Sequence, residues 1–182
     1  MNEKSENPIK ILISGGFGTK NTGDEAILIS EVSSIRREIS NADITVLVKG
    51  TNKENISRLN LKTINDSILN IRQIIRGIMR SDILILGGGG MLQDESSIYN
   101  IIGNLYKLLI AIMLRKKIYL YAVGAVPLRS MINRKLLSYV LRKVNFITVR
   151  DLNSEASLVG LEPSIKNKIK AVSYTHLTLP TN

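Results

Sequence analysis

Short apolar runs recur along this chain and constrain its fold more than any other feature. They occupy residues 10–14, 44–48, 83–86, 118–121 and 146–149. Near-continuous apolar runs of this length are typical of strands that are buried on both faces of a parallel sheet. We therefore expect each run to be a strand.

Helix-length segments lie between the runs, at residues 24–39, 67–80, 98–116 and 130–143. Helical spacing in the first of them gathers one apolar face and turns the charged residues mostly outward. The apolar residues are Ile27, Leu28, Val32, Ile35 and Ile39, and the outward ones are Glu31, Arg36, Arg37 and Glu38. Residues 49–65 predict a short helix and a weak strand at 61–64. The alternation predicts an α/β fold with a doubly wound, mainly parallel, Rossmann-like sheet.

The chain is basic, because 25 Lys and Arg outweigh 15 Asp and Glu among its 182 residues, for a formal net charge of +10. Such an excess favours an anionic partner, such as nucleic acid, lipid headgroups or a phosphorylated substrate, or is simply a solvated basic surface. We expect no nucleic acid, because aromatic residues make up only 4% of the chain and are not interleaved with the charges.

The chain contains no cysteine, which excludes disulfides, thiolate metal sites and cysteine nucleophiles and fits a reducing cytoplasm. Its first ten residues are polar and carry acids, unlike a signal peptide. The most apolar segment, residues 98–117, is interrupted by Asn100, Asn104 and Lys107 and falls short of the roughly 20 apolar residues that a membrane span needs. We expect a soluble, cytoplasmic protein.

Four glycines lie in the stretch ISGGFGTKNTGDEAIL, residues 13–28, after the first apolar run. Gly18 and Gly23 have the spacing of a P-loop. However, Asp24 and Glu25 stand where that loop needs Lys and Ser or Thr, and an acid pair would repel a triphosphate. A dinucleotide fingerprint fails as well, because its third glycine is missing and the second run is followed by Lys49 rather than by an acid that binds ribose.

The same stretch fits a loop whose backbone approaches a ligand closely. The glycines at 15, 16, 18 and 23 allow that approach, and Thr22 can cap the helix that follows. Acids in a first helical turn stabilise a helix by about 0.3–1 kcal/mol each, which explains Asp24 and Glu25 without a ligand. Asp24 is nearer the loop and is the better candidate for binding substrate hydroxyls.

Two further segments follow predicted strands. Residues 87–90 are four consecutive glycines, more than a tight turn needs, and predict a binding loop with Gln93 and Asp94 as its polar contacts. Arg150 follows the run at 146–149 and could hold a carboxylate or phosphate with its planar guanidinium, pair with Asp151, or do both. Ligands of open α/β sheets bind at the carboxyl ends of strands, where all these segments lie.

Four segments, in this order, resemble motifs of the polysaccharide pyruvyl transferase family. They are GGFGTKNTGDEAIL at 15–28, DILILGGGGMLQD at 82–94, YAVGAVPL at 121–128 and ITVRDLNS at 147–154. The resemblance covers most of residues 10–161, and its first two motifs are the more specific. Val123 stands where the family often has Gln and Val126 where it has Gly, so we expect an acceptor that differs from the common one.

The resemblance implies a two-domain, GT-B-like architecture of which this chain is the N-terminal half, forming mainly the acceptor side. It implies transfer of a pyruvyl group from phosphoenolpyruvate to a sugar of a cell-wall or exported polysaccharide, as a ketal. The donor-binding basic residues and the family's histidine would lie in the second half, so no catalytic residue, cofactor or metal is expected here. The expected substrate-binding residues are Gly15, Gly16, Phe17, Gly18, Asn21, Gly23, Asp24, Gly88, Gly89, Gly90, Gln93, Asp94, Gly124, Arg150 and Asp151.

The last residues differ from the rest. The string VSYTHL at 172–177 is similar to an in-frame translation of the transposase-end adapter used in short-read sequencing libraries. We therefore expect residues 172–182 to be an artefactual tail on the front part of a longer protein, with a genuine flexible tail as the alternative. His176 is accordingly no catalytic candidate. We expect residues 1–8 to be disordered and residues 9–171 to form the Rossmann-like N-terminal domain.

Two other functions stay open: a GT-B glycosyltransferase that uses a sugar nucleotide, and a noncatalytic sugar- or anion-binding module. The fragment alone is expected to be inactive. Its expected partners are phosphoenolpyruvate and a carbohydrate acceptor, which could be lipid-linked. The basic surface also favours peripheral contact with the inner face of an anionic membrane.

Overall fold

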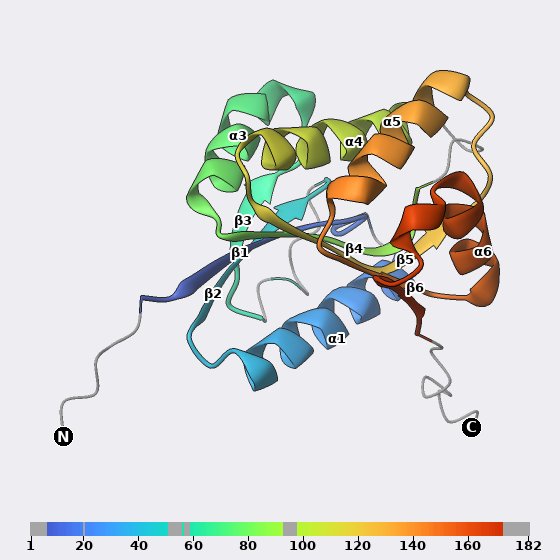
Figure 1. Cartoon of the computed structure of the whole chain (residues 1–182). Helices are drawn as coiled ribbons and strands as arrows, with labels where there is room; N and C mark the ends of the chain where they lie inside the picture. The colour runs from blue at the N-terminus through green and yellow to red at the C-terminus, as the bar shows by residue number, and fades with distance from the viewer. Residues whose placement is uncertain (1–6, 20, 51–55, 57–58, 93–97, 173–182) are drawn as a thin grey trace.

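The computed structural model describes residues 7–19, 21–50, 56, 59–92 and 98–172. A sheet forms its centre, with helices above and below it (Figure 1). Its strands are β1 (Ile9–Ser14), β2 (Ala42–Val48), β3 (Lys62–Asn65), β4 (Ile83–Leu92), β5 (Lys117–Ala125), β6 (Phe146–Val149) and β7 (Ile169–Ala171). All neighbouring strands are parallel, and their order is β3-β2-β1-β4-β5-β6-β7. The expected α/β fold with a doubly wound, parallel, Rossmann-like sheet is therefore confirmed.

Helices cover both faces of the sheet. The α-helices are α1 (Thr22–Glu38), α3 (Ile71–Arg80), α4 (Ile98–Met113), α5 (Met131–Lys143) and α6 (Leu152–Leu161), with short 3-10 helices η1 (Ile68–Asn70) and η2 (Pro163–Ile165). Helix α1 lies on one face, and α3, α4 and α5 lie on the other (Figure 1). Two buried clusters correspond to these layers, one containing Leu28 of α1 and the other Ile74 of α3 and Leu105 of α4.

Three details differ from the sequence-based expectation. Helix α6 was not predicted, and β4 continues to Leu92, beyond the expected end at residue 86. Glu31 was expected to face outward, but it is buried. The weak strand at 61–64 is confirmed as β3. Residues 1–6, most of the expected short helix between 49 and 65, and residues 173–182 lie outside the described residues.

Helix α4 holds the longest apolar segment of the chain, yet it carries a buried charge. Lys107 Nζ pairs with Asp66 Oδ2 at 2.7 Å, and their side chains are only 2% and 6% exposed. Burial lowers the pKa of Lys107, and the Asp66 carboxylate opposes that effect. Within the described residues, no helix is long and apolar enough to cross a membrane.

The strand order defines where a ligand should bind. The chain builds the sheet outward from β1 through β2 to β3, then returns and builds from β4 to β7 on the other side of β1. In such sheets the ligand crevice lies outside the carboxyl ends of the two central strands, where the order reverses. Ser14 at the end of β1 pairs with Leu86 of β4, so the two glycine-rich segments begin side by side at that point.

Candidate functional site

The loop after β1 is held firmly against the end of β2. Phe17 is buried, and its carbonyl accepts a hydrogen bond from the Lys49 amide at 2.8 Å. Thr19 Oγ1 donates to the Gly16 carbonyl at 2.9 Å. Gly18 has a φ of 81°, a left-handed conformation that favours glycine. These contacts hold residues 16–19 against the carboxyl edge of the sheet.

The start of α1 is capped by Asn21. Its side-chain oxygen accepts a hydrogen bond from the Gly23 amide at 3.1 Å, and its backbone is extended. The prediction that Thr22 caps this helix is wrong, because Thr22 is already the first helical residue. Asn is among the strongest N-cap residues, since its short amide reaches the free N–H groups of the first turn.

The four glycines of the second segment belong to a strand. Gly87 pairs with Tyr121 and Gly89 with Val123, and the ladder shifts register between Gly89 and Leu92. The expected loop conformation is therefore wrong, because β5 supplies a parallel partner for this backbone. A Cβ atom on Gly87 would overlap the Glu31 carboxylate, and one on Gly88 would overlap Ile27. These glycines let α1 lie directly on β4. Gln93 and Asp94 lie outside the described residues.

Asp24 lies between the two glycine-rich segments. A Cβ atom on Gly16 would be 2.9 Å from one carboxylate oxygen of Asp24, and a Cβ on Gly89 would be 3.1 Å from the other. Burial raises the pKa of Asp24, while a hydrogen bond from the Asn21 side chain and the positive charge of Lys49 oppose that rise. The structure thus brings Gly16, Asn21 and Gly89 together around one half-buried carboxyl group.

Arg150 forms a second cluster at the same edge. Its Nε donates to Asp151 Oδ2 at 3.0 Å, so the ion pair considered from the sequence is present. A Cβ atom on Gly124 would be 2.7 Å from the guanidinium, which therefore lies on the bare Cα of that glycine. Asp151 also caps α6 by accepting from the Ser154 amide at 2.7 Å, and this bond is the main reason that its pKa is lowered.

Val123 lies between the group of residues around Asp24 and the group around Arg150. On one side it pairs with Gly89, which touches Asp24, and on the other its carbonyl accepts from the Arg150 amide at 3.2 Å. One carboxyl edge therefore presents a carboxylate, which can accept hydrogen bonds from hydroxyl groups, and a half-exposed guanidinium, which can hold an anion. A depression of about 540 Å³ lies beside Arg150 and is lined by residues 150–153 and 171.

Sequence reasoning missed Glu31 at this edge. Its carboxyl group is buried against Gly87, and neither oxygen has a hydrogen-bond partner among the described residues. Burial raises its pKa to about 8. The signal was its spacing, because Glu31 follows Leu28 by three positions and precedes Ile35 by four, inside the apolar stripe of α1.

Within the part of the chain that the structure describes, no group of three or more His, Cys, Asp or Glu side chains could hold a metal ion.

Comparisons with known proteins bear on the family and the fold of this chain. The family model described as polysaccharide pyruvyl transferase matches residues 21–162. A Listeria monocytogenes protein described as a UDP-N-acetylglucosamine 2-epimerase has a similar structure, with a TM-score of 0.54 and 14% identity over 89% of this chain. A hypothetical protein from Streptococcus mutans has a TM-score of 0.54 and 12% identity over 97% of this chain. The chain spans 44% and 63% of the lengths of these two structures. No curated protein matches the chain.

Proposed function

The chain belongs to the polysaccharide pyruvyl transferase family, and from this premise we propose that it is the acceptor-binding half of an enzyme that transfers a pyruvyl group from phosphoenolpyruvate to a polysaccharide. The observation that carries the proposal is the position of Asp24 between the two glycine-rich segments, at the reversal point of the sheet. The absence of side chains on Gly16 and Gly89 lets the Asp24 carboxylate lie against the backbone of both segments, and this carboxylate supplies the acceptor for the hydroxyl hydrogens of a sugar.

The proposed reaction forms a ketal in two steps. In the first step a sugar hydroxyl loses its proton as its oxygen bonds to C2 of phosphoenolpyruvate, and C3 of phosphoenolpyruvate takes up a proton and becomes a methyl group. In the second step another hydroxyl of the same sugar loses its proton as its oxygen bonds to C2, while the C2–O bond to phosphate breaks and inorganic phosphate leaves. Asp24 orients the attacking hydroxyl, and the cations Lys49 and Arg150 favour the phosphate and carboxylate of the donor by charge.

A second, GT-B-like domain is part of this proposal, because the donor has more negative charge than Lys49 and Arg150 alone can neutralise. We place the enzyme in the cytoplasm, in peripheral contact with an anionic membrane, a role that the formal charge of +10 supports. Reading the native gene beyond codon 171 tests the architecture. A second α/β half with clustered basic residues supports it, and a stop codon at that position contradicts it.

The substitution Asp24→Asn tests the site. Loss of a hydrogen bond to a charged group costs about 1.5–3 kcal/mol, so we expect acceptor affinity to fall roughly 10- to 150-fold. Calorimetric titration of acceptor oligosaccharides onto this chain measures the affinity, and phosphate release from phosphoenolpyruvate measures turnover in the longer protein.

The matched control is Glu38→Gln, an exposed acid near the other end of the same helix, which should leave acceptor affinity unchanged. If Asp24→Asn binds the acceptor with the same affinity as wild type, Asp24 stabilises the start of α1 and does not bind the acceptor. Binding of a sugar nucleotide, with no release of phosphate from phosphoenolpyruvate, would instead favour a glycosyltransferase.

A further inference from the structure

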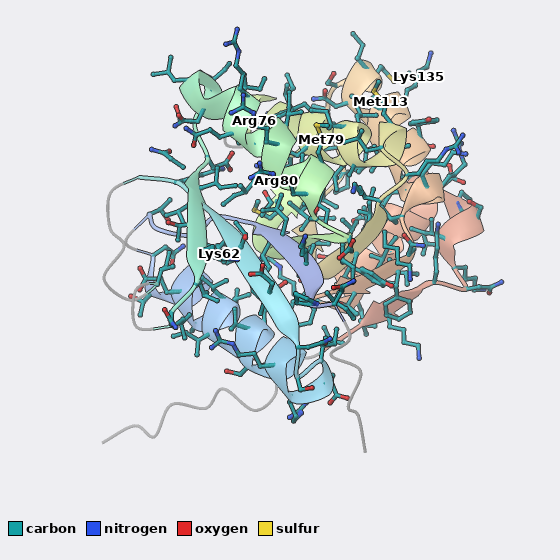
Figure 2. The ribbon with its side chains drawn as sticks, turned by 90° about the vertical axis from the view of Figure 1, so that its left-hand side faces the viewer. Lys62, Arg76, Met79, Arg80, Met113 and Lys135 are labelled. Carbon is teal, nitrogen blue, oxygen red and sulfur yellow. The ribbon has the colours of Figure 1, made fainter. Side chains whose placement is uncertain are left out.

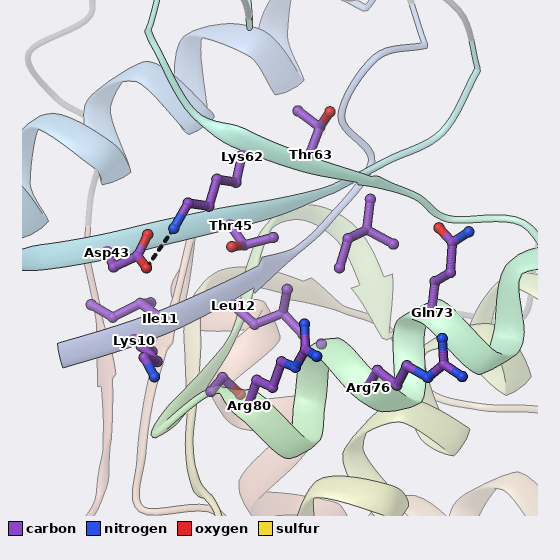
Figure 3. A pocket seen from close by; sticks show the side chains of 13 residues that line it. Lys10, Ile11, Leu12, Asp43, Thr45, Lys62, Thr63, Gln73, Arg76 and Arg80 are labelled. Carbon is purple, nitrogen blue, oxygen red and sulfur yellow. Dashed lines mark hydrogen bonds and ion pairs between the residues drawn. The ribbon is translucent and has the colours of Figure 1, made fainter. Parts of the chain in front are cut away.

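A groove lined by cations lies at the opposite end of the strands from the candidate substrate site. It has a volume of about 700 Å³ and runs between α3 and the amino ends of β1, β2 and β3. Lys10, Lys62, Arg76 and Arg80 line it, and we call it the basic groove (Figure 3). Although it is larger than the depression beside Arg150, it shares no lining residue with that depression.

The groove has charge available for a ligand. Asp43 is the acidic residue in its lining, and it pairs with Lys62 at 2.7 Å. Arg76 and Arg80 lie one helical turn apart on α3, and neither guanidinium has a hydrogen-bond or ion-pair partner among the residues that the structure describes. Two unpaired guanidinium groups in a shallow groove suit the oxygens of a phosphate group.

An exposed apolar tip lies next to the groove. Met79 of α3 is 55% exposed, Met113 at the end of α4 is 82% exposed, and Leu114 follows it. Lys116 Nζ donates to the Met79 carbonyl at 2.7 Å, which fixes the end of α4 beside the end of α3. We call Met79, Met113 and Leu114 the methionine tip; Figure 2 shows its two methionines on the same side of the molecule as Arg76 and Arg80.

The amino end of the sheet therefore combines positive charge with protruding apolar side chains. Around the basic groove and the tip, further cations are Arg115, Lys116 and Lys117, which line a neighbouring depression together with Asp82. Cations draw a protein to an anionic bilayer, and apolar side chains that enter the headgroup region add affinity. A soluble phosphate ester would use the cations but would leave the methionine tip in water.

We propose that the basic groove and the methionine tip form a docking surface for a bilayer that contains anionic phospholipid, with a lipid phosphate held by Arg76 and Arg80. The inference rests on the proposed peripheral role of the protein and names the surface that performs it. Because the groove lies at the amino ends of the strands, docking leaves the carboxyl edge with Asp24 free to receive the acceptor.

Vesicle binding of the whole chain tests the proposal. Wild type should co-sediment with phosphatidylcholine vesicles that contain phosphatidylglycerol, less so at high salt, and hardly at all with phosphatidylcholine alone. Each cation near an anionic surface contributes about a fivefold factor in affinity, so Arg76→Gln with Arg80→Gln should weaken binding roughly 25-fold. The matched control is Lys166→Gln with Lys170→Gln, which removes the same charge near the opposite edge strand, β7, and should weaken binding much less.

A second pair of variants tests the methionine tip. Met79→Gln with Met113→Gln should weaken vesicle binding at high salt, where the apolar contribution remains. The matched control, Met131→Gln with Ile132→Gln, removes exposed apolar residues at the start of α5 and should leave vesicle binding at high salt unchanged. Equal losses in both charge variants, or no loss in the tip variant, would overturn the proposal. So would saturable binding of glycerol phosphate at Arg76 and Arg80, followed by NMR, without any binding to anionic vesicles.

The outcome is separable from the proposed transferase function. The groove variants should keep the wild-type affinity for acceptor oligosaccharides, and Asp24→Asn should keep wild-type vesicle binding. Loss of vesicle binding alone leaves the substrate site standing, and loss of acceptor binding alone leaves the docking surface standing.

Discussion

The buried carboxyl group of Glu31 makes the stability of this protein depend on pH. Its pKa is about 8 in the folded chain against an ordinary 4.5, because burial disfavours the ionised form. The folded state therefore holds this proton more tightly than the unfolded state does. Stability from this residue is fully present below pH 4.5 and is lost as the pH rises through about 8.

We expect Glu31→Gln to remove this loss. Each unit by which the pKa is shifted corresponds to about 1.4 kcal/mol, so the wild-type free energy of unfolding should fall by several kcal/mol between pH 4.5 and about 8. The free energy of unfolding of the variant should change little over the same range. Urea denaturation at a series of pH values measures both. Glu38→Gln, an exposed acid on the same helix, should keep the wild-type slope. A slope that persists in Glu31→Gln would show that another group causes it.

Single residues also show what the sequence could predict about the site. Asp24 was singled out by its place just after a glycine-rich loop, and the structure places it against both glycine-rich segments. Glu31 was assigned to the outer face because it is charged, although its spacing lies within the apolar stripe. A charged side chain predicts an outward position and the helical spacing predicts an inward one, so the two signals conflict at Glu31. The burial of Glu31 depends on the absence of a side chain at Gly87, which lies more than fifty positions away in another strand.

The glycines of β4 determine how closely α1 packs on the sheet. Gly88 has a φ of 21°, and a Cβ atom there would overlap Ile27 of α1. We expect Gly88→Ala to destabilise the protein by about 1–3 kcal/mol, because α1 must move or the core must strain. Chemical denaturation followed by circular dichroism measures the change.

The control is Gly160→Ala in α6, where a Cβ atom would meet nothing within 4 Å. Alanine in a helix is favoured over glycine by about 0.5–1 kcal/mol, so this variant should be slightly more stable than wild type. Gly88→Ala that is as stable as wild type would mean that α1 does not rest on the glycines of β4.

Element types were more predictable than their ends. Apolar runs identify β1, β2 and β6 closely, because a buried parallel strand needs an unbroken apolar sequence. β4 was expected to end at its glycines, because glycine weakens a strand interior. The structure instead continues β4 through these glycines, because they pair with β5. Helix α6 was missed because its first turn looked like part of a binding motif, whereas Asp151 caps that helix.

The sequence is sufficient to predict the layers of the fold but not the contacts between segments that are distant in the sequence. Alternating strands and helices imply a parallel sheet, and a parallel sheet implies a functional edge at the carboxyl ends. The pairing of Lys107 with Asp66 could not be predicted, because it depends on how α4 crosses the sheet toward β3. The sequence showed Lys107 only as an interruption of an apolar segment.

That ion pair joins the two halves of the fold, since Asp66 follows β3 and Lys107 lies in α4, after the chain has returned to β4. We expect Lys107→Met to destabilise the protein by about 3–5 kcal/mol, because it leaves a buried carboxylate unpaired. The double variant Asp66→Asn with Lys107→Met should lose less free energy of unfolding than Lys107→Met alone. Urea denaturation and a double-mutant cycle measure both effects.

The exposed pair of Lys62 and Asp43 is the matched control for burial, because its N–O distance is also 2.7 Å while the Lys62 side chain is 68% exposed. Lys62→Met should therefore cost less than about 1 kcal/mol, since water already stabilises both charges. If Lys107→Met costs no more than Lys62→Met, the buried pair does not hold the two halves together. If Lys107→Met lowers the free energy of unfolding strongly and the added Asp66→Asn recovers part of it, the main cause is the unpaired buried charge and not lost side-chain packing.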